Sequence, residues 1–524
     1  MDNSAQEVPD EPAAPPVEQP EQTAQPGAEA AQAPSPRRLS PAVRRTALAS
    51  VAGCVVLGGV LVLLPDGDGQ GPPPLPGPAG RAVIAAAAGA PAALPDLTAL
   101  IGEREAELRK NPRDDGTWAA LGAAYVERGT RTADSAYYPK AEHALRTSLR
   151  IHPQGNAQAL DGLAALAAAR GDWRGAKKWG EAATKLAPGS WTAYSALVDA
   201  YQGLGDYKAA GRTLEKLSEL ASGTGVTLRT AAVYRDRGWR EDAAAVLTDA
   251  AARAGTPTEQ AALLHRSGEL AWERGEFEDA LHHFDAALAA DPAFAAALAG
   301  RGRALASLGR TSPALQAYQR AIAKRPAPEY ALELGELYES LKLGGQARAQ
   351  YDVLRTRATL QGAHGVDDAL VLGRFEADHG DAESAVERLR AEWKRAPSAA
   401  VADALGWALH RAGDDEEAID LLRRATDRQK GGSVRSALIM YHRGEVEREL
   451  GLYGAARRHI GEALRINPAF SPLLAPQARD ALASLGEPPE GGPEQMWPPK
   501  PKVFAPARNP APPKRRSSAG PARG

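Results

Sequence analysis

The stretch Trp118-Ala-Ala-Leu121-Gly122-Ala-Ala-Tyr125 is the most informative part of this chain. Its large apolar residues stand three and four positions apart, a spacing that places them on one face of a helix. A second apolar face follows at Ala141 and Leu145. Pro153 then ends that segment, because proline lacks the amide hydrogen that a helix interior needs. The stretch therefore predicts two helices joined by a short turn.

The same pattern returns every 33 to 38 residues between residues 111 and 470. A fixed period of this length indicates a repeat architecture. Four residues after the repeated alanine stands a large apolar residue, except in the second unit, which has Gly180. The alanine marks the second helix of ten units: Ala141, Ala176, Ala210, Ala243, Ala280, Ala314, Ala347, Ala385, Ala418 and Ala456.

Glycines recur at two positions of the unit. On first helices we expect them to let the two helix backbones approach at the alanines. In the turns we expect a left-handed glycine to end the first helix. The first-helix glycines are Gly122, Gly268, Gly302, Gly335, Gly373, Gly406 and Gly444. The turn glycines are Gly171, Gly205, Gly275, Gly380 and Gly413.

This pattern resembles the tetratricopeptide repeat (TPR), and the resemblance covers about 70% of the chain, from residue 111 to residue 470. It implies an all-α fold, a right-handed TPR superhelix of about ten helix-turn-helix units. One unit cannot bury its apolar face alone, so neighbouring units must stack into a solenoid. The composition and arrangement are similar to those of TPR proteins of high-GC actinobacteria.

The chain before the repeats has three parts. Residues 1–43 are acidic and proline-rich and read as a disordered tail, since they carry too few apolar residues to bury a core. Residues 44–64 read as a transmembrane anchor, because residues 46–64 carry no charge and would span about 28 Å as a helix. Residues 65–93 are rich in Gly, Pro and Ala and read as a spacer.

Four arginines precede the uncharged segment, and Asp66 and Asp68 follow it. By the positive-inside rule, the protein is then a single-pass membrane protein with a cytoplasmic N-terminus and an extracytoplasmic TPR body. Two alternatives use the same residues. The motif ending at Cys54 resembles the lipobox of lipoproteins acylated at that cysteine, and Arg44-Arg45 resembles a twin-arginine export signal.

The repeats have a predicted helical cap at each end. Residues 97–110 have helical spacing and would cover the first unit, and residues 478–485 would close the last one. These caps bracket a TPR solenoid over residues 94–486. Residues 487–524 are again proline-rich but basic, and read as a disordered tail.

The sequence offers no reaction centre. It contains no phosphate-binding loop, no zinc-protease motif and no nucleophile elbow, and Cys54 is its single cysteine. His282 and His283 are adjacent, so they point to different helix faces and cannot chelate one metal together. The net charge of −2 gives no general attraction to nucleic acid. We therefore expect no catalytic residues, no cofactor, no metal and no specific nucleic acid binding.

The TPR resemblance implies a concave groove lined by first helices, which in this family binds peptide segments. Counting along each unit predicts the residues that face it. Glu333 and Glu336 share one helix face with Glu329, so a basic ligand segment would be attracted there. Trp272 and Trp407 are candidate anchors. The predicted groove residues are Asp199, His265, Glu269, Trp272, Arg303, Glu333, Glu336, Arg374, Trp407, Tyr441 and Arg448.

Together these features predict a non-catalytic protein-protein interaction scaffold at the outer face of the cell membrane, anchored through residues 46–64 and binding a protein or peptide partner. One alternative is a regulatory TPR adaptor on the cytosolic side. A second is a subunit of an envelope enzyme complex.

Overall fold

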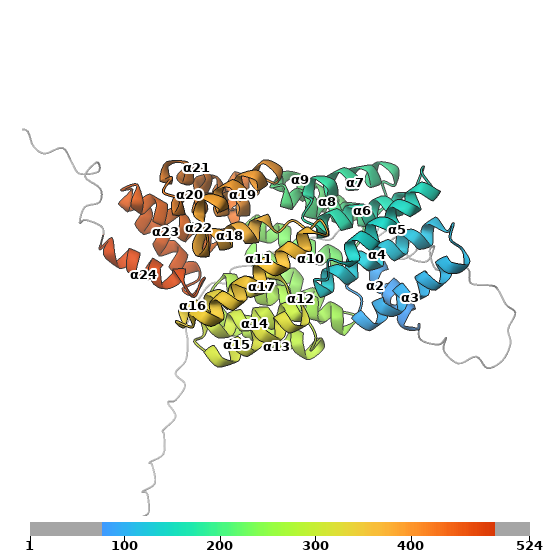
Figure 1. Cartoon of the computed structure of the whole chain (residues 1–524), viewed down its shortest axis with the longest axis horizontal. Helices are drawn as coiled ribbons and strands as arrows, with labels where there is room; N and C mark the ends of the chain where they lie inside the picture. The colour runs from blue at the N-terminus through green and yellow to red at the C-terminus, as the bar shows by residue number, and fades with distance from the viewer. Residues whose placement is uncertain (1–75, 488–524) are drawn as a thin grey trace, which may run out of the picture. The chain divides into compact units, whose positions relative to one another are not determined.

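The computed structural model describes residues 76–487. This part of the chain is helical throughout, with helices α2 to α24, two short 3-10 turns and no strand (Figure 1). Ten consecutive helix pairs, numbered here as units 1 to 10, fill the range from Asp115 to Ile466. The structure thus has the all-α repeat architecture that the sequence predicts.

Each unit consists of a first and a second helix. The first helices are α4 (Asp115–Thr132), α6 (Ala157–Ala169), α8 (Trp191–Gly203), α10 (Thr224–Asp236), α12 (Pro257–Glu273), α14 (Ala295–Ser307), α16 (Pro328–Ser340), α18 (Ala369–His379), α20 (Ala399–Arg411) and α22 (Ala437–Glu449). The second helices are α5 (Tyr137–Ile151), α7 (Trp173–Leu186), α9 (Tyr207–Leu220), α11 (Arg240–Ala252), α13 (Phe277–Ala290), α15 (Thr311–Lys324), α17 (Gly344–Gly362), α19 (Ala382–Arg395), α21 (Asp415–Ala425) and α23 (Tyr453–Ile466). The short turns η1 (Arg428–Lys430) and η2 (Gly432–Val434) lie between units 9 and 10.

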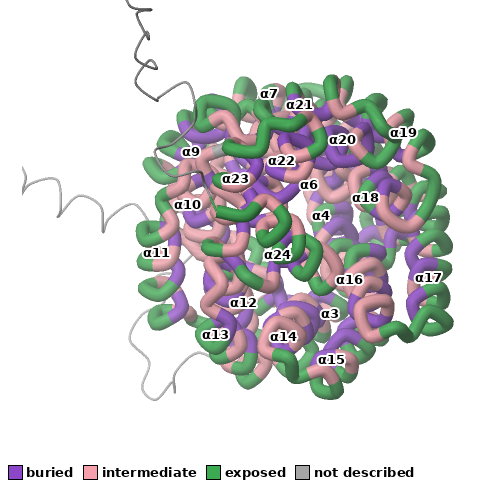
Figure 2. Tube along the Cα trace, turned by 90° about the vertical axis from the view of Figure 1, so that its left-hand side faces the viewer, coloured by how far each residue is buried: buried purple, intermediate pink, exposed green. Residues whose placement is uncertain are grey.

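The ten repeated alanines all lie in second helices and are at most 2% exposed. Buried and exposed residues alternate along most helices, as Figure 2 shows, because each helix has one face against its neighbours. Four second helices begin with an aspartate whose carboxylate accepts a hydrogen bond from a backbone N–H of the first turn. These aspartates are Asp172, Asp206, Asp381 and Asp414.

The turn glycines follow the prediction with one exception. Gly171, Gly205, Gly275 and Gly413 have positive φ angles between 72° and 87°. Gly380 instead has a φ of −137°, because α18 and α19 are separated by two residues where the corresponding turns have three. Unit 7 carries Lys342 at this left-handed position, with a φ of 63°.

The first-helix glycines make the expected backbone approach to the alanine in three units, and in all seven units they make room for a large side chain. At all seven, the atom nearest to an added Cβ belongs to the large residue that follows the alanine by four positions. At Gly122, Gly406 and Gly444, the carbonyl oxygen of the repeated alanine also lies 3.1 to 3.3 Å from that Cβ. A Cβ on Gly335 would lie 2.3 Å from the Tyr351 ring, and one on Gly406 would lie 2.8 Å from Leu422. Unit 2 reverses the arrangement, since Gly180 on α7 lies under Leu197 of α8. The glycines therefore make room for side chains that fill the space between helices.

The predicted spacer over residues 65–93 is wrong for its described part, which forms helix α2 (Pro78–Ala87). Ala79 and Ala82 of α2 are buried against α3 (Leu94–Lys110). Arg81 of α2 donates two hydrogen bonds to Asp96 of α3, at 2.9 and 2.6 Å. The five alanines of α2 and the proline at its start favour a helix, and packing against α3 makes this segment part of the folded body rather than a spacer. At the other end, α24 (Leu474–Ser484) closes the stack as expected.

Units that are six apart along the chain touch each other. The contact joins the turn inside one unit to the loop before the unit six positions later. The turn of unit 2, for example, contacts the loop before unit 8. We call this row of contacts the seam; in its last contact, the turn of unit 5 meets the loop before α24. Its hydrogen bonds include Arg325 Nε to Thr130 O at 3.3 Å, Asp367 N to Arg170 O at 2.8 Å, Ala399 N to Tyr207 Oη at 3.2 Å, Arg240 Nη2 to Arg435 O at 3.1 Å and Asn467 Nδ2 to Trp272 O at 2.8 Å.

The predicted anchor over residues 46–64 and the lipobox at Cys54 lie outside the described residues, as do the tails over residues 1–43 and 488–524. Between residues 76 and 487, none of the helices has both the length and the apolar composition needed to cross a membrane.

Candidate binding channel

A cavity of about 1190 Å³ within the described residues is lined mainly by first helices. We call it the channel. Its wall contains residues of all eight first helices from α8 to α22, and residues 468–476 together with Arg479 form the wall at α24. Of the predicted groove residues, six line it: Trp272, Arg303, Glu333, Glu336, Arg374 and Trp407.

Carboxylates outnumber cations in the wall. The acidic residues are Asp236, Glu329, Glu333, Glu336, Asp367, Asp368, Asp378, Glu392 and Asp403, and the arginines are Arg235, Arg303, Arg374 and Arg479. The channel is therefore acidic, although most of its carboxylates already have a partner within the protein.

Arg303 on α14 links three neighbouring units. Its Nη1 lies 3.0 Å from Glu269 on α12, and its Nη2 lies 2.8 Å from Glu333 on α16. Burial alone would raise the pKa of Glu269, but the charges of Arg303 and His265 outweigh it and bring that pKa down to about 2. Tyr318 also donates a hydrogen bond to Glu333 at 2.8 Å. Glu333 is thus neutralised inside the wall and is a weaker attractant for a basic ligand than the sequence suggests.

Glu336 is also paired. His379 on α18 lies 3.6 Å from Glu336 and 3.1 Å from Glu339, while its ring stacks on Tyr351 with centroids 4.6 Å apart. Burial raises the pKa of Glu336, and the hydrogen bond with His379 only partly offsets this effect. For His379, burial lowers the pKa, but the nearby Glu336 and Glu339 outweigh burial, so the pKa of His379 is raised.

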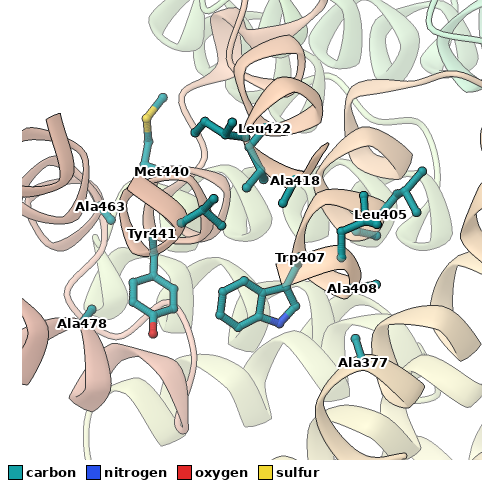
Figure 3. Packing of buried hydrophobic residues seen from close by; sticks show 14 of the residues in the cluster. Ala377, Leu405, Trp407, Ala408, Ala418, Leu422, Met440, Tyr441, Ala463 and Ala478 are labelled. Carbon is teal, nitrogen blue, oxygen red and sulfur yellow. The ribbon is translucent and has the colours of Figure 1, made fainter. Parts of the chain in front are cut away.

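The two tryptophans have different environments. Trp272 is half-buried, with Nε1 donating to Ser307 at 3.0 Å and Arg303 lying 5.0 Å from the ring centroid. Trp407 is only 5% exposed and packs inside the core of units 9 and 10, beside Tyr441 (Figure 3). Trp407 therefore serves the core rather than acting as an exposed anchor.

A buried pair supports Trp407 from one side. His442 stacks on its indole with centroids 4.2 Å apart, and His442 Nδ1 lies 2.9 Å from Asp403 Oδ1. On the other side, the Trp407 Nε1 donates to Asp378 at 3.0 Å. These contacts explain why the ring is held in one orientation.

The other predicted groove residues are not in the channel wall. His265 and Glu269 line a smaller cavity of about 350 Å³ with Phe294 and Arg303. Asp199 pairs with Arg229 at 2.6 Å, and Arg448 pairs with Glu445 at 2.6 Å. Tyr441 is 2% exposed in the core. None of these five residues lines the channel.

Sequence reasoning missed Asp368 and named Glu329 only as part of an acidic helix face, yet these two are the channel carboxylates without an ion pair to any described residue. Glu329 is exposed at the start of α16. Asp368 precedes α18, where burial, Glu329 and Asp367 raise its pKa to about 7. Arg374 is likewise exposed and makes no ion pair with any residue in the described range. Asp368 lies in a loop between units, where the repeat register gives no signal.

Partly exposed apolar side chains lie beside these charges. Leu332 on α16, Leu370 and Val371 on α18, and Leu438 on α22 all line the channel. Over residues 76–487, no group of three or more His, Cys, Asp or Glu residues could hold a metal ion. Within this range, the wall thus offers apolar contacts, two carboxylates without an ion pair, and two guanidinium groups without one, Arg374 and Arg479.

Comparison with known proteins supports this description of the repeats. Sequence profiles of the tetratricopeptide repeat match residues 192–224, 265–327, 308–360 and 401–433. The chain contains tetratricopeptide repeats. The matched TPR segments include units 3, 6, 7 and 9 and most of unit 5.

Several solved structures are similar to the TPR region at low sequence identity. A structure of the human IFIT1 dimer with PPP-AAAA is 17% identical, covers 63% of this chain and 77% of its own, and has a TM-score of 0.41. A tetratricopeptide repeat protein from Parabacteroides merdae is 17% identical, with coverages of 50% and 99% and a TM-score of 0.29. Yeast Tom70 is 13% identical, with coverages of 69% and 96% and a TM-score of 0.29. None of the curated proteins matches the sequence.

Proposed function

We propose that this protein is a non-catalytic scaffold whose channel binds an extended segment of a protein partner. TPR proteins generally act as protein-interaction scaffolds, and the TPR fold is typically non-catalytic. The observation that carries the proposal is the channel itself: residues of eight first helices line it, and α16, α18 and α22 contribute partly exposed apolar side chains beside charges without an ion pair.

The charges of the channel favour a basic segment. Glu329 and Asp368 have no cationic partner among the described residues, so a lysine or arginine of the ligand would neutralise them at little desolvation cost. Arg374 would bind a carboxylate or a backbone carbonyl of the same ligand. A nucleic acid would bring many phosphates to a wall dominated by carboxylates, and this repulsion disfavours it.

We further propose that residues 46–64 anchor the protein in the cell membrane and that the TPR body lies outside the cytoplasm. The uncharged segment and the arginines before it support this topology. A tether of this kind raises the local concentration of any bound partner near the envelope. Protease added to intact cells should digest the repeats while protecting the N-terminus; complete protection would favour the cytosolic adaptor.

Site-specific photocrosslinking in intact cells tests the channel. A benzophenone residue replacing Val371 would face the channel, whereas one replacing Leu360 on α17 would be exposed outside its wall. We expect a defined protein adduct from position 371 and no such adduct from position 360.

Charge reversal makes that test specific. The adduct should be lost with Glu329→Lys and kept with Glu383→Lys. Both glutamates are exposed at the second position of a helix, α16 and α19, and only Glu329 lines the channel. Equal adducts from both positions, or equal effects of both variants, would reject the channel as the binding site.

A further inference from the structure

The sequence that follows α24 is complementary in charge to the channel. Residues 488–524 contain seven basic residues, two acidic residues and eleven prolines. The channel wall contains nine carboxylates and four arginines. A proline-rich peptide favours an extended conformation, which loses little further entropy when it is bound along a groove.

The position of α24 brings this sequence close to the channel. Residues 468–476, which lead into α24, form part of the channel wall, and Figure 2 shows α24 in front of the helices that surround it. Helix α24 has 11 residues and is therefore about 16 Å long. The 37 residues after Glu487 could extend roughly 110 Å as polyproline II. They are long enough to return along α24 and enter the channel.

We propose that residues 488–524 bind in the channel of their own chain and must be displaced by an external partner. This inference rests on the proposed function, because it names the occupant of the same channel. Lysines and arginines of the segment neutralise Glu329 and Asp368. Trp497 or Phe504 contacts the partly exposed Leu332, Leu370 and Val371.

Two further observations fit a positive charge supplied to the channel by a lysine or arginine of the same chain. Asp368 is half-buried beside Glu329 and Asp367. The side-chain amide of Gln361, in the orientation that satisfies both groups, donates to it at 2.9 Å, but Asp368 has no ion pair with any described residue. Its pKa is raised to about 7 in this setting, and a bound lysine would lower it. By contrast, Asp367 lies within ion-pair distance of Arg395, and Glu333 already pairs with Arg303.

Zero-length crosslinking of the full chain in nonionic detergent tests the proposal. A carbodiimide joins a lysine amine to a carboxylate only when the two are in direct contact. We expect links from Lys500, Lys502 or Lys514 to Glu329 or Asp368, identified by mass spectrometry. The yield should be unchanged on tenfold dilution. The link to Asp368 should fall with Glu329→Gln and the link to Glu329 should fall with Asp368→Asn, because each variant leaves the measured carboxylate in place. Glu383→Gln is the matched control and should leave the yield unchanged.

A binding measurement separates this inference from the proposed function. The probe is a fluorescent peptide of residues 495–518, added to the full chain and to a variant with Lys500, Lys502, Lys514, Arg515 and Arg516 all replaced by glutamate. If the native segment competes in cis, the peptide should bind the variant about tenfold more tightly than it binds the original chain.

Each other outcome has a distinct meaning. If the peptide binds both chains equally and this binding still requires Glu329, the inference is overturned. The proposed function of the channel would then still stand. Failure of the peptide to bind either chain would reject a basic ligand altogether. Crosslinks that disappear on dilution would show that the segment binds a second copy, which also overturns the proposal.

Discussion

Gly335 provides the sharpest test of how the units pack. It lies on α16, the helix that presents Glu329, Leu332 and Glu336 to the channel, and its opposite face meets Tyr351 of α17. A Cβ added at Gly335 would lie 2.3 Å from Tyr351 Cε1, more than 1 Å closer than an ordinary contact of about 3.5 Å. We predict that Gly335→Ala destabilises the protein.

The magnitude follows from how firmly Tyr351 is held. Its side chain is 6% exposed, its hydroxyl donates to Glu339 at 2.8 Å, and its ring stacks on His379. Because the ring cannot move aside, the overpacking should cost about 3 kcal/mol, at the upper end of the usual range. Replacing glycine by alanine inside a helix returns about 1 kcal/mol. The expected net loss is about 2 kcal/mol.

Gly102 is the matched control. It lies inside α3 and is exposed, and a Cβ added there would have no neighbouring atom within 4 Å. Gly102→Ala should therefore stabilise the protein by up to about 1 kcal/mol. Urea denaturation followed by circular dichroism measures whether each variant raises or lowers the free energy of unfolding. Hydrogen exchange shows whether the loss of stability in Gly335→Ala is confined to α16 and α17. Stabilisation by both variants would refute the packing argument.

Three further predictions concern stability. Lys342→Gly should raise stability by about 1 kcal/mol in urea denaturation, because it removes a side chain from a left-handed backbone with φ 63°; an unchanged midpoint would mean that this turn is unstrained. Ala314→Leu should cost roughly 1 to 3 kcal/mol, because Ala314 is fully buried where α15 packs on its neighbours; a change below about 0.5 kcal/mol would mean that the register is wrong. Burial lowers the pKa of His265 to about 4, so its contribution to stability is complete above pH 6.5 and is lost as the pH falls toward 4. His265→Phe, which keeps the ring beside Phe284 and Phe294, should remove on the order of 3 kcal/mol of that pH dependence, and identical pH profiles would contradict the assignment.

The fold could be predicted from sequence because its signals are local. The repeated alanines and turn glycines act within one helix pair, so a single unit already specifies its own geometry. The exceptions are positions where another part of the chain intervenes. Helix α2 packs on α3 and its Arg81 pairs with Asp96, and a composition rich in alanine and proline does not reveal these contacts.

The channel was predicted less completely for a related reason. The register placed Arg303, Glu333 and Glu336 in the wall, but it could not show that Arg303 joins Glu269 to Glu333. That pairing depends on the rotation between neighbouring units. Asp368 lies in an inter-unit loop, where burial and the neighbouring Glu329 and Asp367 raise its pKa.

The seam limits how this protein can change its length. Repeat arrays commonly gain or lose units by duplication and deletion, since each unit contacts only its immediate neighbours. Here every hairpin turn from unit 1 to unit 5 is fitted to a loop six units later, as in the hydrogen bond from Asn467 to Trp272. Removing one unit between them would bring five mismatched surfaces together at once. We therefore expect the number of repeats to be fixed, as the number of strands is in a closed barrel.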